Sequence, residues 1–479
     1  MTLIIFLVAA LLLRTYRLTD FLGFWYDQGR DGLVIWDLWH KGKFFLIGPT
    51  TGIEGIFLGP FYYYLIAPFY ILGGGNPLWP ALWLILINIG AIALLYYLGK
   101  TYFSRTCGLL AVIFASFSLQ LSQSHRWLSN PTPLPLFSLI CVTALLKLVH
   151  GSNRWWWVLG ISAGLSLQLE AASAVFFLPA IIIILIWHRS RITASRMHIF
   201  SMAMMFALTL LPQLIFDFRH DHILLSAFHR FLVSEKSFRT GLTGILVSRL
   251  DFYWKIFSQK FFFDTRLSVA FAIFIALSAF LVKKSLPRIP VRILLVWLLV
   301  PVISLLFYHG NKGYVWEYYF TGVYPVLILI ISAVLSAVIW QYRWGLIMVG
   351  FWIGAFMVAN LFQYGLYISP PVPGYVSLAS QIPAVDWIYR DAGPRPFNAD
   401  FYVPPVIFYA YDYLLLWRGG MYSAQPSVSR QPLLYTLHEP DSEHPFFLKA
   451  WLDRQDSYAA VDGSVNFGPI TVERRFRLK

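Results

Sequence analysis

The sequence predicts an α-helical polytopic membrane protein that carries a small extracytoplasmic α/β appendage at its C-terminus. Of its 479 residues, 58% are hydrophobic, and the mean hydropathy is +0.63. Soluble domains are usually about 45–50% apolar. Apolar runs of about 20 residues also recur along the chain, and each is long enough to cross a hydrocarbon core about 30 Å thick. Both observations indicate a chain that crosses the membrane many times.

Hydropathy and loop charge together predict about eleven transmembrane helices in residues 1–361. The first begins near the N-terminus and lacks the basic start and small-residue cleavage site of a signal peptide, so we expect it to be retained. The expected spans are residues 2–18, 78–99, 107–123, 133–150, 155–169, 172–187, 197–216, 266–282, 291–307, 321–339 and 344–361.

Basic residues gather in the short loops on one side of these spans, which predicts that this side is cytoplasmic. Residues 188–196 and 283–292 are typical of them. The other side carries nearly all the acidic residues. We expect an integral protein of a bacterial plasma membrane, with a cytoplasmic N-terminus and an extracytoplasmic C-terminal part.

This orientation requires that residues 58–73 do not cross the membrane. The stretch contains Pro60, Pro68 and three consecutive tyrosines, which favour an interfacial or re-entrant helix. If the stretch did cross, every later loop would change sides.

The net charge of +14 does not indicate a nucleic-acid partner, because most Lys and Arg residues lie in short loops between apolar runs. The two cysteines, Cys107 and Cys141, both fall in apolar segments and form neither a metal-site spacing nor a disulfide framework. We expect them to be small buried core residues.

The composition changes near residue 362. Residues 369–374, SPPVPG, are typical of a linker. No run after it is long enough to span a membrane, so residues 362–479 are expected to form the extracytoplasmic domain.

The first outer loop, residues 19–77, holds a dense set of charges for a chain that is 13% charged. Asp27 and Asp31 are one helical turn apart. With a helix that starts near Gln28, Asp27 would be its N-cap, and a purely structural cap is an open alternative to a catalytic carboxylate. We expect Asp27 to be the reacting group of a membrane enzyme.

Two further outer loops carry polar residues of the kind that bind phosphate or sugar. In residues 122–131, His125 and Arg126 are placed to hold a phosphate, although Arg126 with Trp127 also fits an interfacial anchor. In residues 309–320, Lys312 is a candidate phosphate ligand and Glu317 a candidate sugar ligand or a partner for a nearby cation. Residues 217–222, DFRHDH, lack a recognised ligand spacing and are weak evidence for a metal.

Together these pieces resemble the GT-C membrane glycosyltransferases that use polyprenyl-phosphate sugars. The features are a first span, an acidic outer loop, the pattern GP-x-YYY-x-x-AP at residues 59–68, the end of the span near residue 126, and YYFTGVYP at 318–325. The closest branch is family 39, with the protein O-mannosyltransferases and the related aminoarabinose transferases of lipid A. The resemblance covers about residues 1–360.

The resemblance implies a hexosyl- or pentosyltransferase in which Asp27 takes the proton of an acceptor hydroxyl while a lipid phosphate leaves. The implied donor is a polyprenyl-phosphate sugar, and the acceptor is a hydroxyl of a glycan, lipid or protein. No cofactor is assigned; a divalent metal is possible but not supported, and no metal ligand is named. The expected substrate-binding residues are Gln28, Arg30, Asp31, Glu54, Tyr62, Tyr63, His125, Arg126, Lys312, Glu317 and Tyr318.

The chain departs from the family at two points. The acidic pair of the first outer loop is Asp27-Gln28 here, and the base that precedes Pro-Pro-Leu in relatives is absent at Leu58-Gly59-Pro60-Phe61. Two other classes therefore stay open: a transporter or flippase for a lipid-linked substrate, and a non-catalytic relative that binds a glycolipid. Ionisable residues at helix ends, rather than at mid-membrane, favour the enzyme over a transporter.

Overall fold

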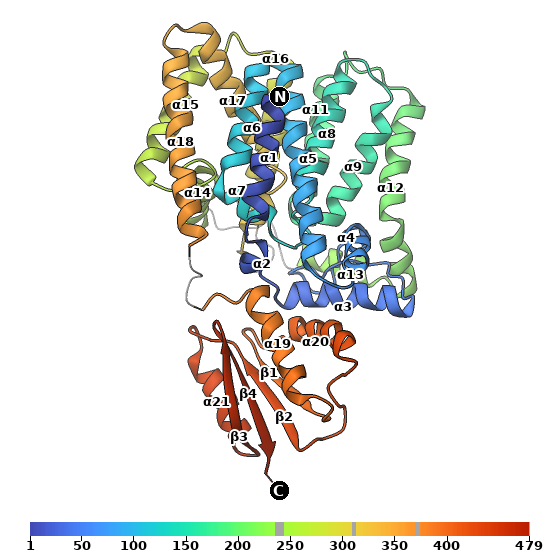
Figure 1. Cartoon of the computed structure of the whole chain (residues 1–479). Helices are drawn as coiled ribbons and strands as arrows, with labels where there is room; N and C mark the ends of the chain where they lie inside the picture. The colour runs from blue at the N-terminus through green and yellow to red at the C-terminus, as the bar shows by residue number, and fades with distance from the viewer. Residues whose placement is uncertain (235–243, 309–312, 370–373, 479) are drawn as a thin grey trace.

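The computed structural model describes residues 1–234, 244–308, 313–369 and 374–478. It consists of a bundle of helices and, below one end of it, a C-terminal α/β unit (Figure 1). The N-terminus lies at the opposite end of the bundle. Because charged side chains are nearly absent from the middle of the apolar helices, the bundle presents an apolar surface of the kind that faces lipid.

Each expected span overlaps a helix of the bundle, and residues 107–123 fall on two helices, α6 and α7. Six of the described helices are long and apolar enough to cross a membrane, and α6 with α7, bent by 68°, has the length and composition of one broken span or of a re-entrant loop. The total number of spans stays a prediction. The helices of the bundle are α1 (Thr2–Thr15), α5 (Leu78–Tyr102), α6 (Arg105–Phe117), α7 (Leu119–His125), α8 (Leu134–Val149), α9 (Trp155–Leu169), α11 (Phe177–Trp187), α12 (Arg196–Arg219), α15 (Thr265–Val282), α16 (Arg288–Leu306), α17 (Tyr324–Gln341) and α18 (Gly345–Tyr367).

Shorter helices connect the helices of the bundle. Figure 1 shows α3 lying across the end of the bundle, between the bundle and the C-terminal unit, with α4 and α13 beside it. In this position the helix buries Gln28, Gly29, Asp31, Gly32 and Ile35. The connecting elements are α2 (Leu18–Phe21), α3 (Tyr26–Lys41), α4 (Phe61–Leu72), α10 (Ala171–Ala174), α13 (Ile223–His229), the π-helical turn η1 (Arg230–Ser234), α14 (Gly244–Ser258) and the 3₁₀ turn η3 (Glu317–Phe320).

The start of α3 differs from the expected one. The helix begins at Tyr26 with Trp25 as its N-cap, so Asp27 lies in the first turn and is not the cap. The oxygen of the Gln28 side chain accepts a hydrogen bond from the backbone N–H of Trp25 (3.1 Å). The alternative in which Asp27 is the N-cap of this helix is therefore wrong, because Trp25 is the N-cap and the side chain of Gln28 supplies the capping contact from inside the helix.

Helix α4 is too short to cross a membrane, because 12 residues span only about 18 Å. Its first residue contacts the bundle, and the turn that follows it contacts the C-terminal unit. The N–H of Phe61 donates to Gln168 at the end of α9 (3.0 Å), and the carbonyl of Gly74 accepts from Trp417 of the C-terminal unit (2.7 Å). This arrangement agrees with the prediction that residues 58–73 stay on one side.

The C-terminal unit has the expected mixed α/β composition. Its four-stranded sheet has the order β1-β2-β4-β3, with β1 parallel to β2 and the other neighbours antiparallel. Leu434, Tyr435 and Leu437 of the central strand β2 are buried in its core. The elements are α19 (Leu378–Ala392), β1 (Asn398–Tyr402), α20 (Tyr409–Tyr422), β2 (Leu433–His438), α21 (Pro445–Asp456), β3 (Ala459–Phe467) and β4 (Ile470–Arg477).

The C-terminal unit packs against α3 through two glycines. A Cβ atom on Gly29 would lie 2.3 Å from the backbone nitrogen of Ala410, and one on Gly32 would lie 2.8 Å from the ring of Tyr413. Only glycine lets two helices approach so closely at these positions. Helix α20 therefore lies directly against α3, on the side away from the bundle.

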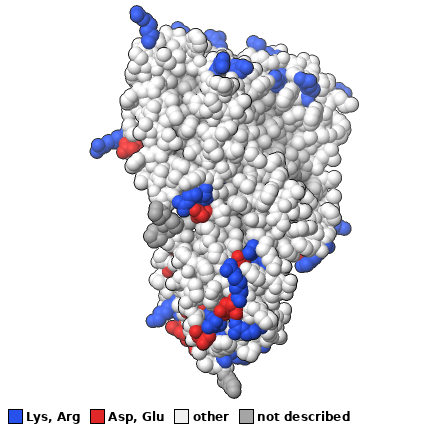
Figure 2. All heavy atoms as spheres, viewed as in Figure 1, with Lys and Arg blue, Asp and Glu red and all other residues white. Residues whose placement is uncertain are grey.

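Charge is distributed unevenly along the molecule. On the face drawn in Figure 2, Lys and Arg without Asp or Glu appear at the end of the bundle farthest from the C-terminal unit, whereas both signs appear on that unit. This asymmetry is what the loop charges predict. Which end faces the cytoplasm stays a prediction.

Candidate functional site

Three charged side chains meet at the start of α3. The Nη1 atom of Arg30 lies 2.8 Å from Oδ1 of Asp27, and its Nη2 atom lies 2.8 Å from Oδ1 of Asp31. The hydroxyl of Tyr63, from α4, donates to Asp31 (3.0 Å). The i, i+3 and i, i+1 spacings on one helix bring the carboxylates to a single guanidinium, whose planar fork suits two acceptors.

The two carboxylates have different surroundings. The side chain of Asp27 is 42% exposed, whereas that of Asp31 is 5% exposed. Burial raises the pKa of Asp31 to about 6, although Arg30 and the hydroxyl of Tyr63 act in the opposite direction. Asp27 is thus the carboxylate that solvent reaches, and the buried Asp31 holds the other arm of Arg30.

A cavity of about 490 Å³ opens beside this end of α3. Its walls come from the chain between α2 and α3, from α7 and the loop after it, from η3 and the start of α17, and from the end of α18. Aromatic and polar groups alternate around it, as in many small-molecule sites. The lining residues are Phe21, Gly23, Trp25, Gln120, Gln123, Ser124, Arg126, Trp127, Pro131, Thr132, Glu317, Tyr318, Thr321, Tyr324, Leu366, Tyr367 and Tyr375.

Arg126 lines the cavity and does not use all of its hydrogen-bond donors within the described residues. Its Nη2 atom donates to the carbonyl of Tyr16 (2.9 Å), but its buried Nε and Nη1 atoms have no partner among the described residues. The guanidinium lies 5.4 Å from the ring centres of both Phe21 and Tyr367. A buried cation with unsatisfied N–H groups favours an anion in the adjacent cavity.

A second cation lies behind the opposite wall. Lys260, from the loop between α14 and α15, is buried, and its ammonium forms an ion pair with Glu317. It also lies 4.3 Å from the ring centre of Tyr324. Burial lowers the pKa of Lys260, while the charge of Glu317 opposes that shift.

Tyr318 connects the cavity with Asp27. Burial raises the pKa of Tyr318, and the negative charges of Glu170 and Asp27 raise it further. Both carboxylates therefore lie within electrostatic range of its hydroxyl. Glu170 is itself buried at the turn between α9 and α10, where burial raises its pKa to about 8.

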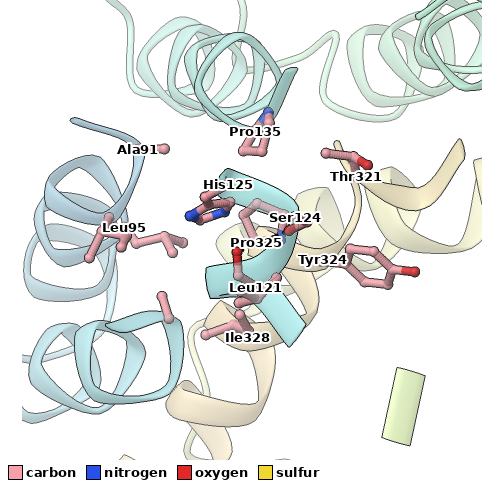
Figure 3. Close-up of a pocket in the computed structure, with 12 residues that line it drawn as sticks. Ala91, Leu95, Leu121, Ser124, His125, Pro135, Thr321, Tyr324, Pro325 and Ile328 are labelled. Carbon is pink, nitrogen blue, oxygen red and sulfur yellow. Dashed lines mark hydrogen bonds between the residues drawn. The ribbon is translucent and has the colours of Figure 1, made fainter. Parts of the chain in front are cut away.

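His125 lies apart from the main cavity. It lines a small pocket of about 20 Å³, the size that holds one water molecule. Figure 3 shows its ring between Pro135 and the helix that carries Ala91 and Leu95, with Thr321 and Tyr324 farther along the pocket. Its Nδ1 atom accepts from Nε of Arg14 (3.0 Å). The histidine thus belongs to a buried contact behind the site.

The structure separates the other expected site residues. Arg126, Glu317 and Tyr318 line the cavity, and Arg30 and Asp31 lie with Asp27 at its side. Gln28 is buried and donates to the carbonyl of Leu128 (3.0 Å). Tyr63 belongs to the cluster at the start of α3 through its hydrogen bond to Asp31, whereas Tyr62 is buried in the core and Glu54 is exposed and does not line the cavity. Lys312 lies outside the described residues.

Sequence reasoning missed Lys260 and Glu170 as members of this region. Lys260 is one of many basic residues in a long outer loop, and its burial depends on helices far away in the chain. Glu170 had a local signal, a lone acidic residue between two apolar segments. Such a residue, if it is buried, needs a functional or structural reason.

The described residues contain no group of three or more His, Cys, Asp or Glu side chains that could hold a metal ion. In the DFRHDH stretch, Asp217 accepts hydrogen bonds from the backbone N–H groups of Leu224 (2.7 Å) and Leu225 (3.2 Å). That contact caps the next helix, so the stretch has a structural role.

Comparison with known proteins agrees with this architecture. Residues 58–216 match the family model described as dolichyl-phosphate-mannose-protein mannosyltransferase. Crystal structures of ArnT from Cupriavidus metallidurans, bound to undecaprenyl phosphate and in the apo state, are similar over 98% of this chain and 97% of theirs. Their TM-scores are 0.63 and 0.62, at 11% sequence identity.

The apo oligosaccharyltransferase of Archaeoglobus fulgidus is also similar, with a TM-score of 0.51 and 14% identity over 89% of this chain and 64% of that one. A search of curated proteins found no match. The fold is that of the GT-C membrane glycosyltransferases, which confirms the resemblance to this group and to the aminoarabinose transferases.

Proposed function

We propose that the chain is an integral membrane glycosyltransferase that moves a sugar from a polyprenyl-phosphate donor to an acceptor hydroxyl on the extracytoplasmic face. Asp27 is the general base in this proposal. The family match over residues 58–216 and the GT-C fold support the reaction class. The undecaprenyl phosphate bound to the similar ArnT structure supports the donor class.

One observation carries the proposal furthest: Arg126 lines a cavity beside Asp27, and two of its nitrogen atoms, Nε and Nη1, have no partner in the described part of the chain. Buried donors without partners cost free energy, and a phosphate oxygen in the cavity would satisfy them. The rings of Phe21 and Tyr367 flank the same guanidinium and suit the first isoprene units of a lipid chain.

The reaction needs one proton acceptor and stabilisation of a leaving phosphate. The acceptor oxygen attacks the anomeric carbon, and the bond from that carbon to the phosphate oxygen breaks. Asp27 takes the hydroxyl proton, a step worth about 10²–10⁴-fold in rate. The lipid phosphate leaves with the bonding electrons, and Arg126 stabilises its charge. Lys260 adds positive potential behind the cavity wall.

Arg30 holds Asp27 in place for this step. Its pairing with Asp31 and with Thr50 (2.8 Å to the hydroxyl) leaves little freedom for the guanidinium. A base that is fixed in this way loses less conformational entropy when it contacts the acceptor hydroxyl.

A lipid flippase is the second candidate, because the cavity, with Arg126 on its wall, also suits a lipid phosphate in transit. The two functions differ in their products. A transferase releases polyprenyl phosphate and joins the sugar to an acceptor, whereas a flippase moves the intact donor between leaflets. A non-catalytic relative binds the donor and does neither.

Incubation of the purified protein with a panel of polyprenyl-phosphate pentoses and hexoses tests the proposal. The expected result is release of polyprenyl phosphate with transfer of one class of sugar to an added acceptor, and no release by Asp27→Asn. Movement of an intact fluorescent donor across liposome leaflets, without sugar release, would instead assign the flippase function.

A further inference from the structure

The chain between α2 and α3, residues 21–25, forms both a wall of the cavity and the entrance to α3. We call it the strap. Phe21, Gly23 and Trp25 of the strap line the cavity. The next two residues begin α3 and include Asp27. Whatever fixes the strap therefore fixes the position of Asp27 relative to the cavity.

The C-terminal unit holds the strap at regular intervals. The hydroxyl of Tyr375 donates to the carbonyl of Phe21 (3.0 Å), and the N–H of Leu378 donates to the carbonyl of Leu22 (3.0 Å). The Nε2 atom of Gln381 donates to the carbonyl of Phe24 (2.9 Å). Leu378 and Gln381 lie in the first turn of α19, and Tyr375 lies just before that helix.

Gln381 is the innermost of these contacts. It is 1% exposed, and its amide lies against a buried pair from the C-terminal unit. The hydroxyl of Tyr411, in α20, donates to Oε1 of Glu439, at the end of β2 (2.6 Å). The Gln381 amide also lies close enough to Glu439 to lower the pKa of its carboxyl, against the effect of burial. The amide thus links the core of the C-terminal unit to the last carbonyl before the N-cap of α3.

A second amide holds the same turn from the other side. Gln28 donates from Nε2 to the carbonyl of Leu128 in the bundle (3.0 Å). The first turn of α3 is therefore attached to the bundle through Gln28 and to the C-terminal unit through Gln381. A carboxylate in that turn has its position set by both parts of the molecule.

We propose that Gln381 is a positioning residue for the transfer reaction: its hydrogen bond to Phe24 fixes the first turn of α3 and so places Asp27 at the cavity. The C-terminal unit thereby helps to position the site, although Tyr375 is its only described residue that lines the cavity. The inference rests on the proposed function of Asp27.

The test compares Gln381→Met with Gln455→Met in the full-length protein. Methionine keeps the length of the side chain and removes the hydrogen bonds. Gln455 is a matched control, because it is equally buried in the same unit and donates to Asp400 (2.6 Å), away from the strap. Gln455→Met removes this contact and also the hydrogen bond that Gln455 accepts from Tyr458, so the control loses at least as many amide contacts as Gln381→Met.

Two measurements follow. Hydrogen–deuterium exchange of a peptide covering residues 26–31 is expected to accelerate about tenfold in Gln381→Met, the scale of one lost hydrogen bond, and to stay unchanged in Gln455→Met. With the donor that the wild-type protein uses, kcat is expected to fall about tenfold or more in Gln381→Met. The donor KM should stay within about twofold, because Arg126 is untouched.

Exchange needs no sugar donor, so its outcome is separate from that of the proposed function. Unchanged exchange at residues 26–31 in Gln381→Met overturns the inference even if the wild-type protein transfers sugar. An equal loss of kcat in Gln455→Met overturns it as well, because a general loss of stability in the C-terminal unit would then explain both results.

Discussion

The Nη1 atom of Arg30 lies 2.8 Å from Oδ1 of Asp27, one turn earlier on the same helix. The contact is more than a surface ion pair, because the other arm of the guanidinium is anchored on the buried Asp31. An exposed pair of this spacing contributes little to stability. Here the anchoring gives Asp27 one preferred orientation at the side of the cavity, which is what a general base needs.

Replacing Asp27 by Asn should abolish transfer while the fold survives. The variant keeps the shape of the side chain but cannot take a proton, so we expect a loss of about 10²–10⁴-fold in kcat. The rate of polyprenyl phosphate release at saturating donor measures it.

Asp37→Asn is the matched control. Asp37 lies on the same helix and pairs with Lys41 (2.6 Å) and Lys43 (2.9 Å), both exposed. The Asp37→Asn variant should retain wild-type activity. If Asp27→Asn were as active as Asp37→Asn, Asp27 would not be the base.

Arg126→Lys should weaken use of the donor, because an ammonium cannot reproduce paired hydrogen bonds to a phosphate. Hydrogen bonds to charged groups contribute about 1.5–3 kcal/mol, so a loss of about ten- to a hundredfold in kcat/KM is expected, and more in Arg126→Ala. Binding of undecaprenyl phosphate to the purified variants gives an independent measure.

Arg17→Lys provides the comparison. Arg17 also lies near Phe21 (5.5 Å to the ring centre), but it pairs with Asp20 (2.6 Å). Wild-type kinetics in Arg126→Lys at every donor concentration would reduce Arg126 to an interfacial anchor and leave the flippase and binding functions open.

Much of the architecture follows from the sequence, since apolar length and loop charge are local signals. Asp27, Arg30 and Asp31 form one cluster because helical spacing alone brings them together. The cavity wall is different: Lys260 reaches Glu317 across 57 residues, and Gln381 reaches Phe24 across 357. No local sequence pattern predicts such contacts, because they depend on how helices that are distant in the chain pack together.

Helix α3 also has features that follow from the local sequence and features that depend on distant contacts. A helix that starts near Gln28 was considered from the sequence, whereas α3 starts at Tyr26. Gln28 is buried and caps the helix with its own side chain, whereas the resemblance assigned it to substrate. Its role depends on Leu128, which only the folded bundle brings near.

The position of α4 on one side of the membrane is testable with single cysteines. Glu54→Cys precedes α4 and Gly74→Cys follows it, and both should react with an impermeant thiol reagent added from outside. Arg191→Cys, at the basic end of the bundle, should react only after the membrane is opened. Cys107 and Cys141 are buried, which keeps the background low.

Labelling of Glu54→Cys and Gly74→Cys from opposite sides would show that α4 crosses the membrane. Labelling of both only after opening, with Arg191→Cys accessible from outside, would keep α4 on one side but reverse the predicted orientation.

Gly29→Ala should loosen the contact between α3 and α20. The new methyl group would lie 2.3 Å from the backbone of Ala410, which cannot move like a side chain. Overpacking of this kind costs about 1–3 kcal/mol. We expect a lower melting temperature and faster proteolysis within residues 362–479.

Gly350→Ala is the control for this substitution. Gly350 lies within α18 with no atom within 4 Å of an added methyl group, so alanine there should leave the melting temperature unchanged or raise it. Wild-type proteolysis in Gly29→Ala would show that the close approach at α20 is not needed.

The stability of the protein should depend on pH through Glu439. Burial raises the pKa of this carboxyl to about 7, since the hydroxyl of Tyr411 and the amide of Gln381 offset burial only in part. In the unfolded chain a glutamate loses its proton near pH 4.3. Between these values the folded state keeps a proton that the unfolded state has released, so the free energy of unfolding falls as pH rises from about 4.5 to 7 and then levels off.

Glu439→Gln stays neutral at every pH and should remove this fall. A pKa shift of one unit corresponds to about 1.4 kcal/mol, so the difference between pH 8 and pH 5 is on the order of 3 kcal/mol. Asp31 and Glu170 also have raised pKa values, and their contribution remains in both proteins. The informative quantity is therefore the change in melting temperature from pH 5 to pH 8 in the wild-type protein minus that in the variant.

We expect the wild-type protein to lose more stability over this range than Glu439→Gln does. Glu443→Gln, an exposed substitution five residues after β2 ends, should behave as the wild type. Equal pH dependence in all three proteins would mean that Glu439 is solvated and ionised in the folded state. The link from the C-terminal unit through Gln381 to the strap would then lack its buried partner.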